Sequence, residues 1–402
     1  MTIKDGTGGN KWSDDQFLDG LRLQGDAAAD QCLAQLHDVL EEKDFSDLFQ
    51  RLKTNAVVLS EDVPGPLSAF LTRTMKLPLI ATSPIDHERI KRGQRVFMTH
   101  ALPAALVLLA KSLPEGYAAP NLSKVLSISN NLSQRPYRRL LGVLQMLINV
   151  SAVGGFEPSG KALITVPKIR LLHAGVRKIV REHLTSYEAQ HGVPVNLEDQ
   201  LGTVMGFSYL VIAGLQQLRI GLSNEQAEDL FYVWRIFAQM MGIHPEGHTE
   251  SSEYVPRNLA EAKQFYESYR RRHYVSAVNN PEGVQLAAVH LQLLNDLLPQ
   301  TPLRRLGMHI LPRMYMEELM GKEGCKRIGI APVRFLYLTK WLVATFPSIW
   351  SRLWYVVDRV DASQHLHENI SRVFFQGLIN REYNGEITFR IPDTLDELNR
   401  LA

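Results

Sequence analysis

The sequence predicts an all-α protein folded as a multi-helix bundle. From about Trp12 to the end of the chain, apolar residues recur at spacings of three and four, and the alternation typical of strands is almost missing. The chain has 402 residues and 45% hydrophobic content, which is enough to bury a large core. No segment repeats at a fixed period, and this argues against a solenoid.

The first elements form an extension ahead of the main body. We expect helical structure from Ser13 to Glu42 with a break near Gly25, followed by a Pro-bounded connection. Asn55–Leu59 is the only segment of this connection that we allow as a short strand. We therefore divide the chain into an N-terminal helical extension and connector, residues 1–85, and a helical domain, residues 86–402.

The remaining helices follow in order along the second part. We expect them at residues 86–112, 120–132, 136–153, from just after Pro167 to about 192, and at 196–218, 223–241, 259–272, 281–298, 303–320, 332–346, 347–357 and 363–379. Asn196 can cap one of them, and Ser223 with Gln226 forms a capping box for the next. The four helices between Pro136 and Met241 are longer, more apolar and better capped than the rest, so we expect them to form the core of the bundle.

Charge and cysteine content restrict the partners and the compartment. The formal net charge is only +2, from 44 basic and 42 acidic side chains, so the sequence does not indicate a nucleic-acid partner. Cys32 and Cys325 lie far apart and neither belongs to a CxxC pair, which disfavours a disulfide framework. The first 15 residues contain no apolar signal region, and we therefore expect a cytoplasmic protein.

Two apolar segments raise the question of a membrane. Residues 200–218 carry no charge but are interrupted by glycines, which favours a buried central helix over a membrane span. Residues 335–357 combine three tryptophans with Lys340, Pro347 and Arg352, and this mixture fits core-packed or interfacial helices. Peripheral contact with a membrane surface is the form of membrane association that this composition allows.

Most common catalytic motifs are absent. The sequence has no GxSxG, Walker A, GxGxxG or HExxH, so hydrolase, nucleotide-binding and zinc-protease functions have no motif support. The 13 histidines are scattered rather than arranged as a metal-binding set. His244 and His248 are spaced by four, but the intervening Pro and Gly favour a loop in which both have structural or surface roles.

One histidine does stand in a distinctive setting. Arg170 lies three positions before His173 and Arg177 four positions after it, so the three side chains share one face of a helix. A neutral imidazole can bind haem iron, and flanking guanidinium groups can pair with the two haem propionates. The alternative is that His173 is a satisfied core histidine on a basic amphipathic helix.

Several motifs around this histidine resemble a known family. They are Tyr137-Arg-Arg-Leu-Leu141, Gly154-Gly-Phe156 with Gly160, Arg170-Leu-Leu-His-Ala-Gly-Val-Arg177, His191-Gly-Val-Pro-Val-Asn-Leu-Glu-Asp199, Met205-Gly-Phe207, and Trp234 with Met241-Gly-Ile243. In order and spacing they resemble the rubber oxygenase (latex-clearing protein) and MpaB family of haem proteins. The resemblance runs roughly from Phe97 to Asp393, with its core at about 97–300.

The resemblance implies a globin-like helical core that binds b-type haem. It makes His173 the proximal iron ligand, and it makes Arg170 and Arg177 residues that either orient the helix or meet the propionates. Arg139 matches an arginine on the facing, distal helix, where it would line the reaction site. The alternative for Arg139 is a buried capping or ion-pair role.

The chain also departs from the family pattern. Rubber-cleaving members carry Lys-Thr shortly after the distal arginine and many others carry Glu-Thr, whereas this chain has Gly142-Val143. No Asp or Glu occurs between Glu115 and Glu157, so the distal helices offer no carboxylate base. We expect an apolar opening beside the iron. The residues expected to shape it are Val143 and Phe207, together with Leu144, Leu147 and Leu210.

These observations predict a haem b oxygenase that uses dioxygen on a small apolar substrate, an unsaturated lipid or isoprenoid. Two alternatives remain open. The first is a haem-binding protein without oxygenase turnover, such as a sensor or carrier, which the Gly142-Val143 departure favours. The second is a haem-free helical protein that acts at a membrane surface or in protein interactions, which the tryptophans of residues 335–357 favour.

Overall fold

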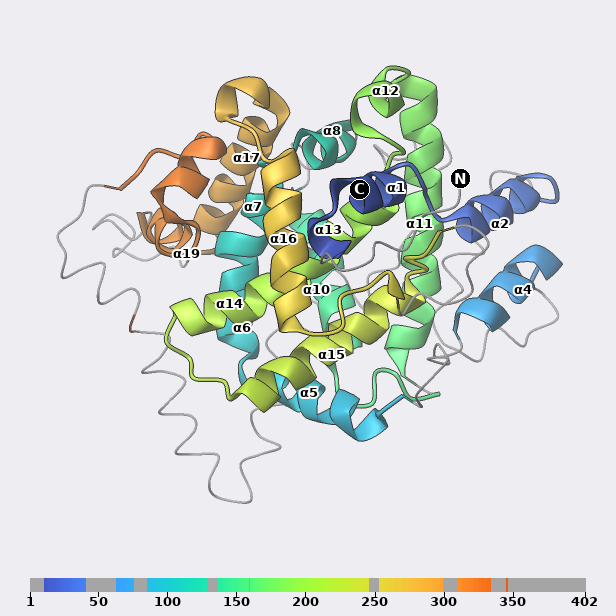
Figure 1. Ribbon diagram of the computed structural model, residues 1–402, viewed down its shortest axis with the longest axis horizontal. Helices are drawn as coiled ribbons and strands as arrows, with labels where there is room; N and C mark the ends of the chain where they lie inside the picture. The colour runs from blue at the N-terminus through green and yellow to red at the C-terminus, as the bar shows by residue number, and fades with distance from the viewer. Residues whose placement is uncertain are drawn as a thin grey trace.

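The structure is a computed structural model in which the helices pack into one bundle (Figure 1). It describes residues 11–40, 63–75, 85–128, 136–158, 160–245, 253–298, 310–333 and Thr345; for residues 136–139 it describes the backbone only. Within these ranges every regular element is a helix. The predicted all-α class is therefore confirmed.

The helices fall into four consecutive groups. The N-terminal group is η1 (Lys11–Ser13), α1 (Asp15–Arg22), α2 (Ala27–His37) and α4 (Gly65–Thr74). The second is α5 (His87–Thr99), α6 (Ala101–Val107), η3 (Leu108–Ser112), α7 (Leu113–Gly116) and α8 (Pro120–Ile128). The third is α10 (Pro136–Ser151), α11 (Lys161–His183), α12 (Tyr187–His191), α13 (Leu197–Phe207), α14 (Tyr209–Gln217) and α15 (Asn224–Met240). The last is α16 (Leu259–His273), η5 (Ala277–Asn279), α17 (Pro281–Leu297) and α19 (Leu311–Arg327).

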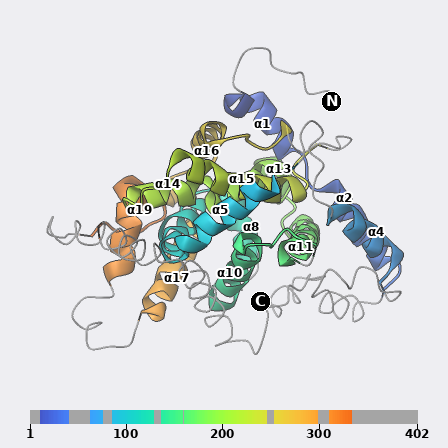
Figure 2. The same cartoon turned by 90° about the horizontal axis from the view of Figure 1, so that it is seen from below.

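Helix α13 occupies the middle of the bundle. It contacts α1, α14, α15 and α16, and its apolar side chains belong to the main core. Below it in Figure 1, α15 and α5 run side by side and form the most extensive helix pair. Seen from below, α10 and α11 lie next to this pair, on the opposite side from α14 and α16 (Figure 2). The helices expected to build the core therefore do so.

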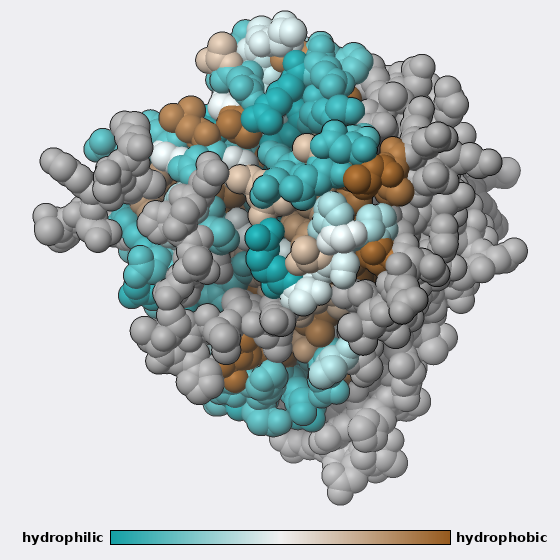
Figure 3. Space-filling view, turned by 90° about the vertical axis from the view of Figure 1, so that its right-hand side faces the viewer, coloured by the Kyte–Doolittle hydropathy of each residue, from teal (hydrophilic) through white to brown (hydrophobic). Residues whose placement is uncertain are grey.

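The N-terminal residues pack directly on this body. Trp12, Leu18 and Leu21 are buried in the main core cluster. Helices α2 and α4 pack on each other and against α11, and they share a second, smaller hydrophobic cluster with its outer face. On this side of the molecule the described surface is mainly hydrophilic, with hydrophobic residues in scattered patches (Figure 3). The division of the chain at residue 85 stays a prediction.

Most of the expected caps are present. The chain breaks between α1 and α2, at the position predicted from Gly25. The Asn196 side chain accepts a hydrogen bond of 2.8 Å from the Asp199 amide at the start of α13. Ser223 and Gln226 form the reciprocal capping box of α15. These caps satisfy amide groups that would otherwise be left without partners at a helix start.

The predicted start of the histidine helix was wrong. Helix α11 begins at Lys161, after the extended residue Gly160, so Pro167 lies inside the helix. Proline in a helix interior removes one backbone hydrogen bond and usually ends the helix, but packing of the buried residues on both sides of Pro167 sustains it here. The helix also ends earlier than expected, at His183, and α12 follows as a separate element.

Two other predicted helices differ from the structure. The helix expected at 86–112 bends by 78° between α5 and α6, next to His100. The helix expected at 303–320 continues to Arg327 as α19, across the non-helical Gly321. The start at Leu303 lies outside the described residues, as do 55–59, His248, almost all of 332–357, and 363–379.

No single described helix is long and apolar enough to cross a membrane. The bent pair His87–Thr99 and Ala101–Gly116 passes the same test by length and composition only. The uncharged segment 200–218 is divided at Ser208 into α13 and α14, and most of its apolar side chains are buried inside the bundle. This agrees with its interpretation as a central buried segment.

Candidate cofactor site

His173 lies in the second half of α11 and points into the bundle. Its Nδ1 atom is shielded from solvent and makes no hydrogen bond of normal geometry, yet the residue as a whole is only half-buried. The exposed surface of the residue therefore lies on atoms other than Nδ1. Desolvation and the nearby Arg177 charge lower the pKa of His173 to about 4. The imidazole is neutral at pH 7, which is the form that binds a metal ion.

Gln200, near the start of α13, is the polar neighbour of this ring. Its side chain favours the protonated imidazole, but its Oε1 atom completes no hydrogen bond of normal geometry. The amide nitrogen at the other end donates to the Val195 carbonyl at 3.1 Å. Val195 has a positive φ of 52°, an uncommon conformation for a β-branched residue. The loop before α13 thus holds the Gln200 side chain beside the histidine.

Arg170, one turn before His173 on α11, is buried and fully engaged. Its Nε and Nη2 atoms bind the two carboxylate oxygens of Asp26 at 2.6 and 2.8 Å, and its Nη1 atom donates to the Met240 carbonyl at 3.1 Å. The guanidinium also lies 5.2 Å from the ring centre of Phe70. Gly242, with φ of 72°, comes so close that a Cβ atom there would lie 2.5 Å from Nη2.

Arg177 has a matching arrangement two turns further along. Its side chain has no exposed surface, and its Nε and Nη2 atoms bind Asp30 at 2.9 and 2.7 Å. Its Nη1 atom donates to the Val195 carbonyl at 3.2 Å. A Cβ atom at Gly25 would come within 3.1 Å of this arginine, so the break between α1 and α2 lets the backbone pass close to it.

The two arginines therefore anchor α2 to the helix that carries His173. Burial raises the pKa of Asp26, but the charge and hydrogen bonds of Arg170 more than offset this, so the pKa is lowered and the carboxylate stays ionised. The resemblance left two roles open, orienting the helix or meeting the propionates. The observed contacts support the orienting role, because both guanidinium groups already hold carboxylates of the protein.

Helix α10 faces α11 with a polar edge. Asn149 donates to the Thr165 hydroxyl at 2.9 Å, and Gln145, one turn earlier, donates to Asn149 at 3.0 Å. Gly142 precedes Gln145 by three residues and so shares this face. His173 lies eight residues after Thr165 on α11, and Gly142 lies seven residues before Asn149 on α10. Gly142 therefore presents no side chain on the face of α10 that contacts α11.

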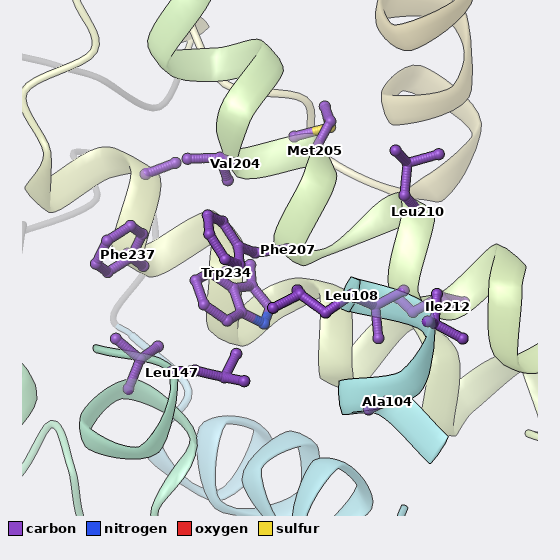
Figure 4. Close-up of a cluster of buried hydrophobic side chains, with 14 of the residues drawn as sticks. Ala104, Leu108, Leu147, Val204, Met205, Phe207, Leu210, Ile212, Trp234 and Phe237 are labelled. Atoms are coloured by element: carbon purple, nitrogen blue, oxygen red, sulfur yellow. The ribbon is translucent and has the colours of Figure 1, made fainter. Parts of the chain in front are cut away.

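The residues expected to shape an apolar pocket belong to one cluster. Phe207 stacks on Trp234 with ring centres 5.4 Å apart and planes 16° apart. Leu147 and Leu108 lie beside this pair (Figure 4). Val143 is half-buried and packs on the same core, which also holds Leu144 and Leu210. The Trp234 Nε1 atom is buried there without a hydrogen-bond partner.

Arg139 lies in the first turn of α10, and its side chain is outside the described residues. The helix that carries it contacts α11. Its catalytic role stays a prediction.

The described residues include no group of three or more His, Cys, Asp or Glu side chains that could hold a metal ion. Haem supplies four nitrogen ligands of its own and needs one axial side chain from the protein. A neutral, partly exposed histidine whose Nδ1 atom is shielded meets this requirement. Buried polar atoms without a hydrogen-bond partner also occur on two other core helices. They belong to Gln145 on α10 and to Trp234 and Gln239 on α15. The residues present therefore fit axial haem ligation.

Sequence reasoning missed three residues of this site. Asp26 and Asp30 lie near the start of α2, where Asp26 also caps the helix, and their partners are about 145 positions away in the sequence. The N-cap pattern at Asp26 was the only available signal, and it does not indicate a long-range ion pair. Gln200 belongs to no recognised ligand motif, so only the fold places it next to His173.

Comparisons with known proteins identify the family and the fold of this chain. Residues 91–345 match the family described as ER-bound oxygenase mpaB/B'/Rubber oxygenase, catalytic domain. A rubber oxygenase from Streptomyces sp. (strain K30) is 22% identical over 278 residues, which are 68% of this chain and 64% of that protein. This chain thus spans less than two thirds of that relative. The structure of latex clearing protein LCP in the closed state superposes with a TM-score of 0.69 at 19% identity, covering 92% of this chain and 95% of that one.

Proposed function

Because this chain belongs to the mpaB and rubber oxygenase catalytic-domain family, we propose that it is a haem-dependent oxygenase acting on a small apolar substrate, an unsaturated lipid or isoprenoid. The observation that carries this proposal is the His173 ring. It is neutral, its Nδ1 atom is shielded, and it faces the interior of the bundle. Haem b, when bound, would supply the redox chemistry with dioxygen.

The protein would contribute ligation, rigidity and polarity. His173 would give its free nitrogen to the iron, and the Asp26–Arg170 and Asp30–Arg177 pairs would hold α11 in place. Phe207, Trp234 and their apolar neighbours would exclude water and accept a hydrocarbon substrate. Arg139 would supply the polar group on the distal side.

Dioxygen uptake by the haem-loaded protein tests this proposal. The protein is mixed with unsaturated isoprenoids and lipids, oxygen consumption is recorded, and the products are analysed by mass spectrometry. We expect oxygen to be incorporated into at least one unsaturated substrate, and both signals to be lost in His173→Ala. A haem-loaded protein that neither consumes oxygen nor forms product with any of them contradicts the proposal.

The same experiment examines the second candidate function, a haem-binding protein without turnover. Gly142-Val143 favours this alternative, because the distal helix lacks the Lys-Thr or Glu-Thr pair of many family members. Restoring that pair by Gly142→Lys with Val143→Thr would convert an inactive haem protein into an oxygen-consuming one if the missing pair is the cause. An active wild-type protein would exclude this alternative.

A further inference from the structure

We infer that His290 is a positioning residue that sets the shape of the apolar pocket. Its ring stabilises the wide π-helical turn η3, and this turn places the Leu108 side chain beside Phe207 and Trp234. The consequence for substrate choice rests on the proposed oxygenase function. The contact between His290 and η3 belongs to the protein alone and can be tested without haem.

The turn η3 interrupts a segment that is otherwise α-helical. Helices α6, η3 and α7 follow one another without a break, and η3 is the π-helical part. At its end the Leu113 amide donates to the carbonyl of Leu108, five residues earlier, rather than to that of Leu109. Pro114 accounts for the wide turn, because it has no amide hydrogen and its ring opposes the carbonyl four residues before it.

The Leu109 carbonyl thereby loses its helical donor, and His290 replaces it. In an α-helix the Leu113 amide would bond to this carbonyl, and in a longer π-helix the donor would come from position 114, which is proline. Instead, His290 Nε2 on α17 lies 2.7 Å from the Leu109 oxygen. A shielded carbonyl without a donor is costly, so this bond favours the wide turn over a closed α-helical one, in which the same carbonyl is already occupied.

The protonation of the His290 ring follows from its two neighbours. A carbonyl can only accept, so Nε2 carries the proton and donates it to Leu109. Burial lowers the pKa of His290 to about 4, so the ring is neutral at pH 7 and Nδ1 is an acceptor. Nδ1 lies 3.4 Å from the Tyr117 hydroxyl, which can donate to it. Both ring nitrogens thus face the segment that contains η3 and α7.

Both ends of the wide turn are anchored to other helices. Before it, Val107 packs against Gly214 of α14 so closely that no Cβ atom would fit there. Within it, the Lys111 ammonium donates to the Leu319 carbonyl of α19 at 2.6 Å. An α-helix advances by about 100° per residue, so closing the turn by one residue would rotate one anchored end against the other by about that angle.

This rotation would change the wall of the apolar pocket. Leu108 is the first residue of η3, has no exposed surface, and lies beside the stacked rings of Phe207 and Trp234 (Figure 4). With the turn closed, the helix would present a different side chain to these rings. His290 does not touch the pocket itself and acts on its shape through η3.

Nuclear magnetic resonance of the haem-free protein tests the positioning of Leu108. The neighbouring aromatic rings shift the Leu108 methyl resonances, so these resonances report where the side chain lies. We expect them to move in His290→Leu and to stay in place in His290→Gln, whose amide can still donate to the Leu109 carbonyl. Gln94→Met is the matched control. It removes another bond from a buried side chain to a backbone carbonyl and should lower stability without moving Leu108.

Pro114→Ala tests the cause of the wide turn. It restores the missing amide hydrogen, so the Leu109 carbonyl can be satisfied within the helix and no longer needs His290. In urea denaturation we expect His290→Leu to raise the unfolding equilibrium constant on the order of tenfold in the wild-type background, and far less in the Pro114→Ala background. If His290→Leu does not fold alone, the double variant should fold.

Three results would overturn the inference. They are unchanged Leu108 resonances in a folded His290→Leu, equal losses of stability in the two backgrounds, and a double variant that does not fold.

The haem-loaded variants test the consequence for the substrate. We compare kcat/KM for a short and a long unsaturated isoprenoid and expect their ratio to change about tenfold in His290→Leu, and to stay the same in His290→Gln and Gln94→Met. An unchanged ratio in His290→Leu would contradict the role of His290 in shaping the pocket. If the wild-type protein shows no oxygen uptake, the proposed function fails, while the resonance and denaturation measurements still decide whether His290 positions Leu108.

Discussion

Neighbouring polar side chains of α11 differ sharply in whether their hydrogen bonds are satisfied. Toward α2, the guanidinium groups of Arg170 and Arg177 are bound by Asp26 and Asp30 at distances of 2.6 to 3.0 Å. Toward α13, the shielded nitrogen of His173 and the amide oxygen of Gln200 remain without hydrogen bonds of normal geometry. The arginine ion pairs stabilise the fold. The His173 and Gln200 atoms make no such contribution, because they are left without partners.

This difference separates residues that build the site from residues that act in it. The spacing of Arg170, His173 and Arg177 on one helix suggested that all three side chains contact the cofactor. The structure instead places the arginines in a buried charge network and leaves the histidine to the interior. The comparison therefore makes different predictions for the arginine pairs, whose loss should lower stability, and for His173, whose loss should abolish ligand binding.

The largest effect is expected from Asp26→Ala. This change leaves Arg170 buried and unpaired, and we expect it to lower the free energy of unfolding by about 3–5 kcal/mol. Asp15→Ala removes an exposed carboxylate paired with Arg271 and is the matched control, with an expected loss of about 0–1 kcal/mol. Urea denaturation measures both. Equal effects of the two substitutions would show that the Asp26 pair does not anchor α11.

Acidification should weaken the fold through His173. Its pKa is about 4 in the folded protein and about 6.5 when unfolded, so the unfolded state binds the proton more tightly between these values. Stability should therefore fall as pH drops from 7 toward 4, with a contribution on the order of 2 kcal/mol from His173 at pH 5. Denaturation of haem-free wild type and His173→Leu at pH 7 and pH 5 measures this contribution. The same pH dependence in both proteins would contradict burial of a neutral histidine.

Gly242→Ala should disturb the Arg170 side of the helix. The φ of 72° and the short distance that would separate an added methyl group from Arg170 Nη2 both oppose a side chain, and we expect a loss of about 1–3 kcal/mol. Gly206, inside α13, has open space around its Cβ position, so Gly206→Ala should be neutral or stabilise by up to about 1 kcal/mol. Thermal unfolding distinguishes these outcomes. A neutral Gly242→Ala would mean that the arginine can move without cost.

The smallest effect, and one of opposite sign, is expected at Gln239. Both polar atoms of this buried side chain lack partners, so Gln239→Met should be neutral or should stabilise the haem-free protein by about 1 kcal/mol. Gln94→Met is the matched control, because Gln94 is buried but donates to the Val150 carbonyl at 2.9 Å, and it should destabilise. Denaturation of both variants gives the comparison. A clear loss of stability in Gln239→Met would show that its amide is satisfied in the folded protein.

The sequence predicted the helices well because their signals are local. The capping box at Ser223 and the N-cap at Asn196 depend on residues within one turn, and both are present. The start of α11 was predicted wrongly because Pro167 usually begins a helix, whereas buried packing carries the helix through it. The Asp26–Arg170 pair and the approach of Gln200 to His173 join distant segments, so they depend on the fold and leave no local pattern.

Haem binding by the wild type and by His173→Ala tests the central claim most directly. Both proteins are expressed with sufficient haem, and bound haem is quantified by absorption and by the pyridine haemochrome assay, with helix content checked by circular dichroism. We predict a b-type spectrum in the wild type, and its loss in His173→Ala at unchanged helix content. Haem retained equally in the variant, or bound by neither folded protein, would contradict the assignment of the inner side of α11 as the cofactor site.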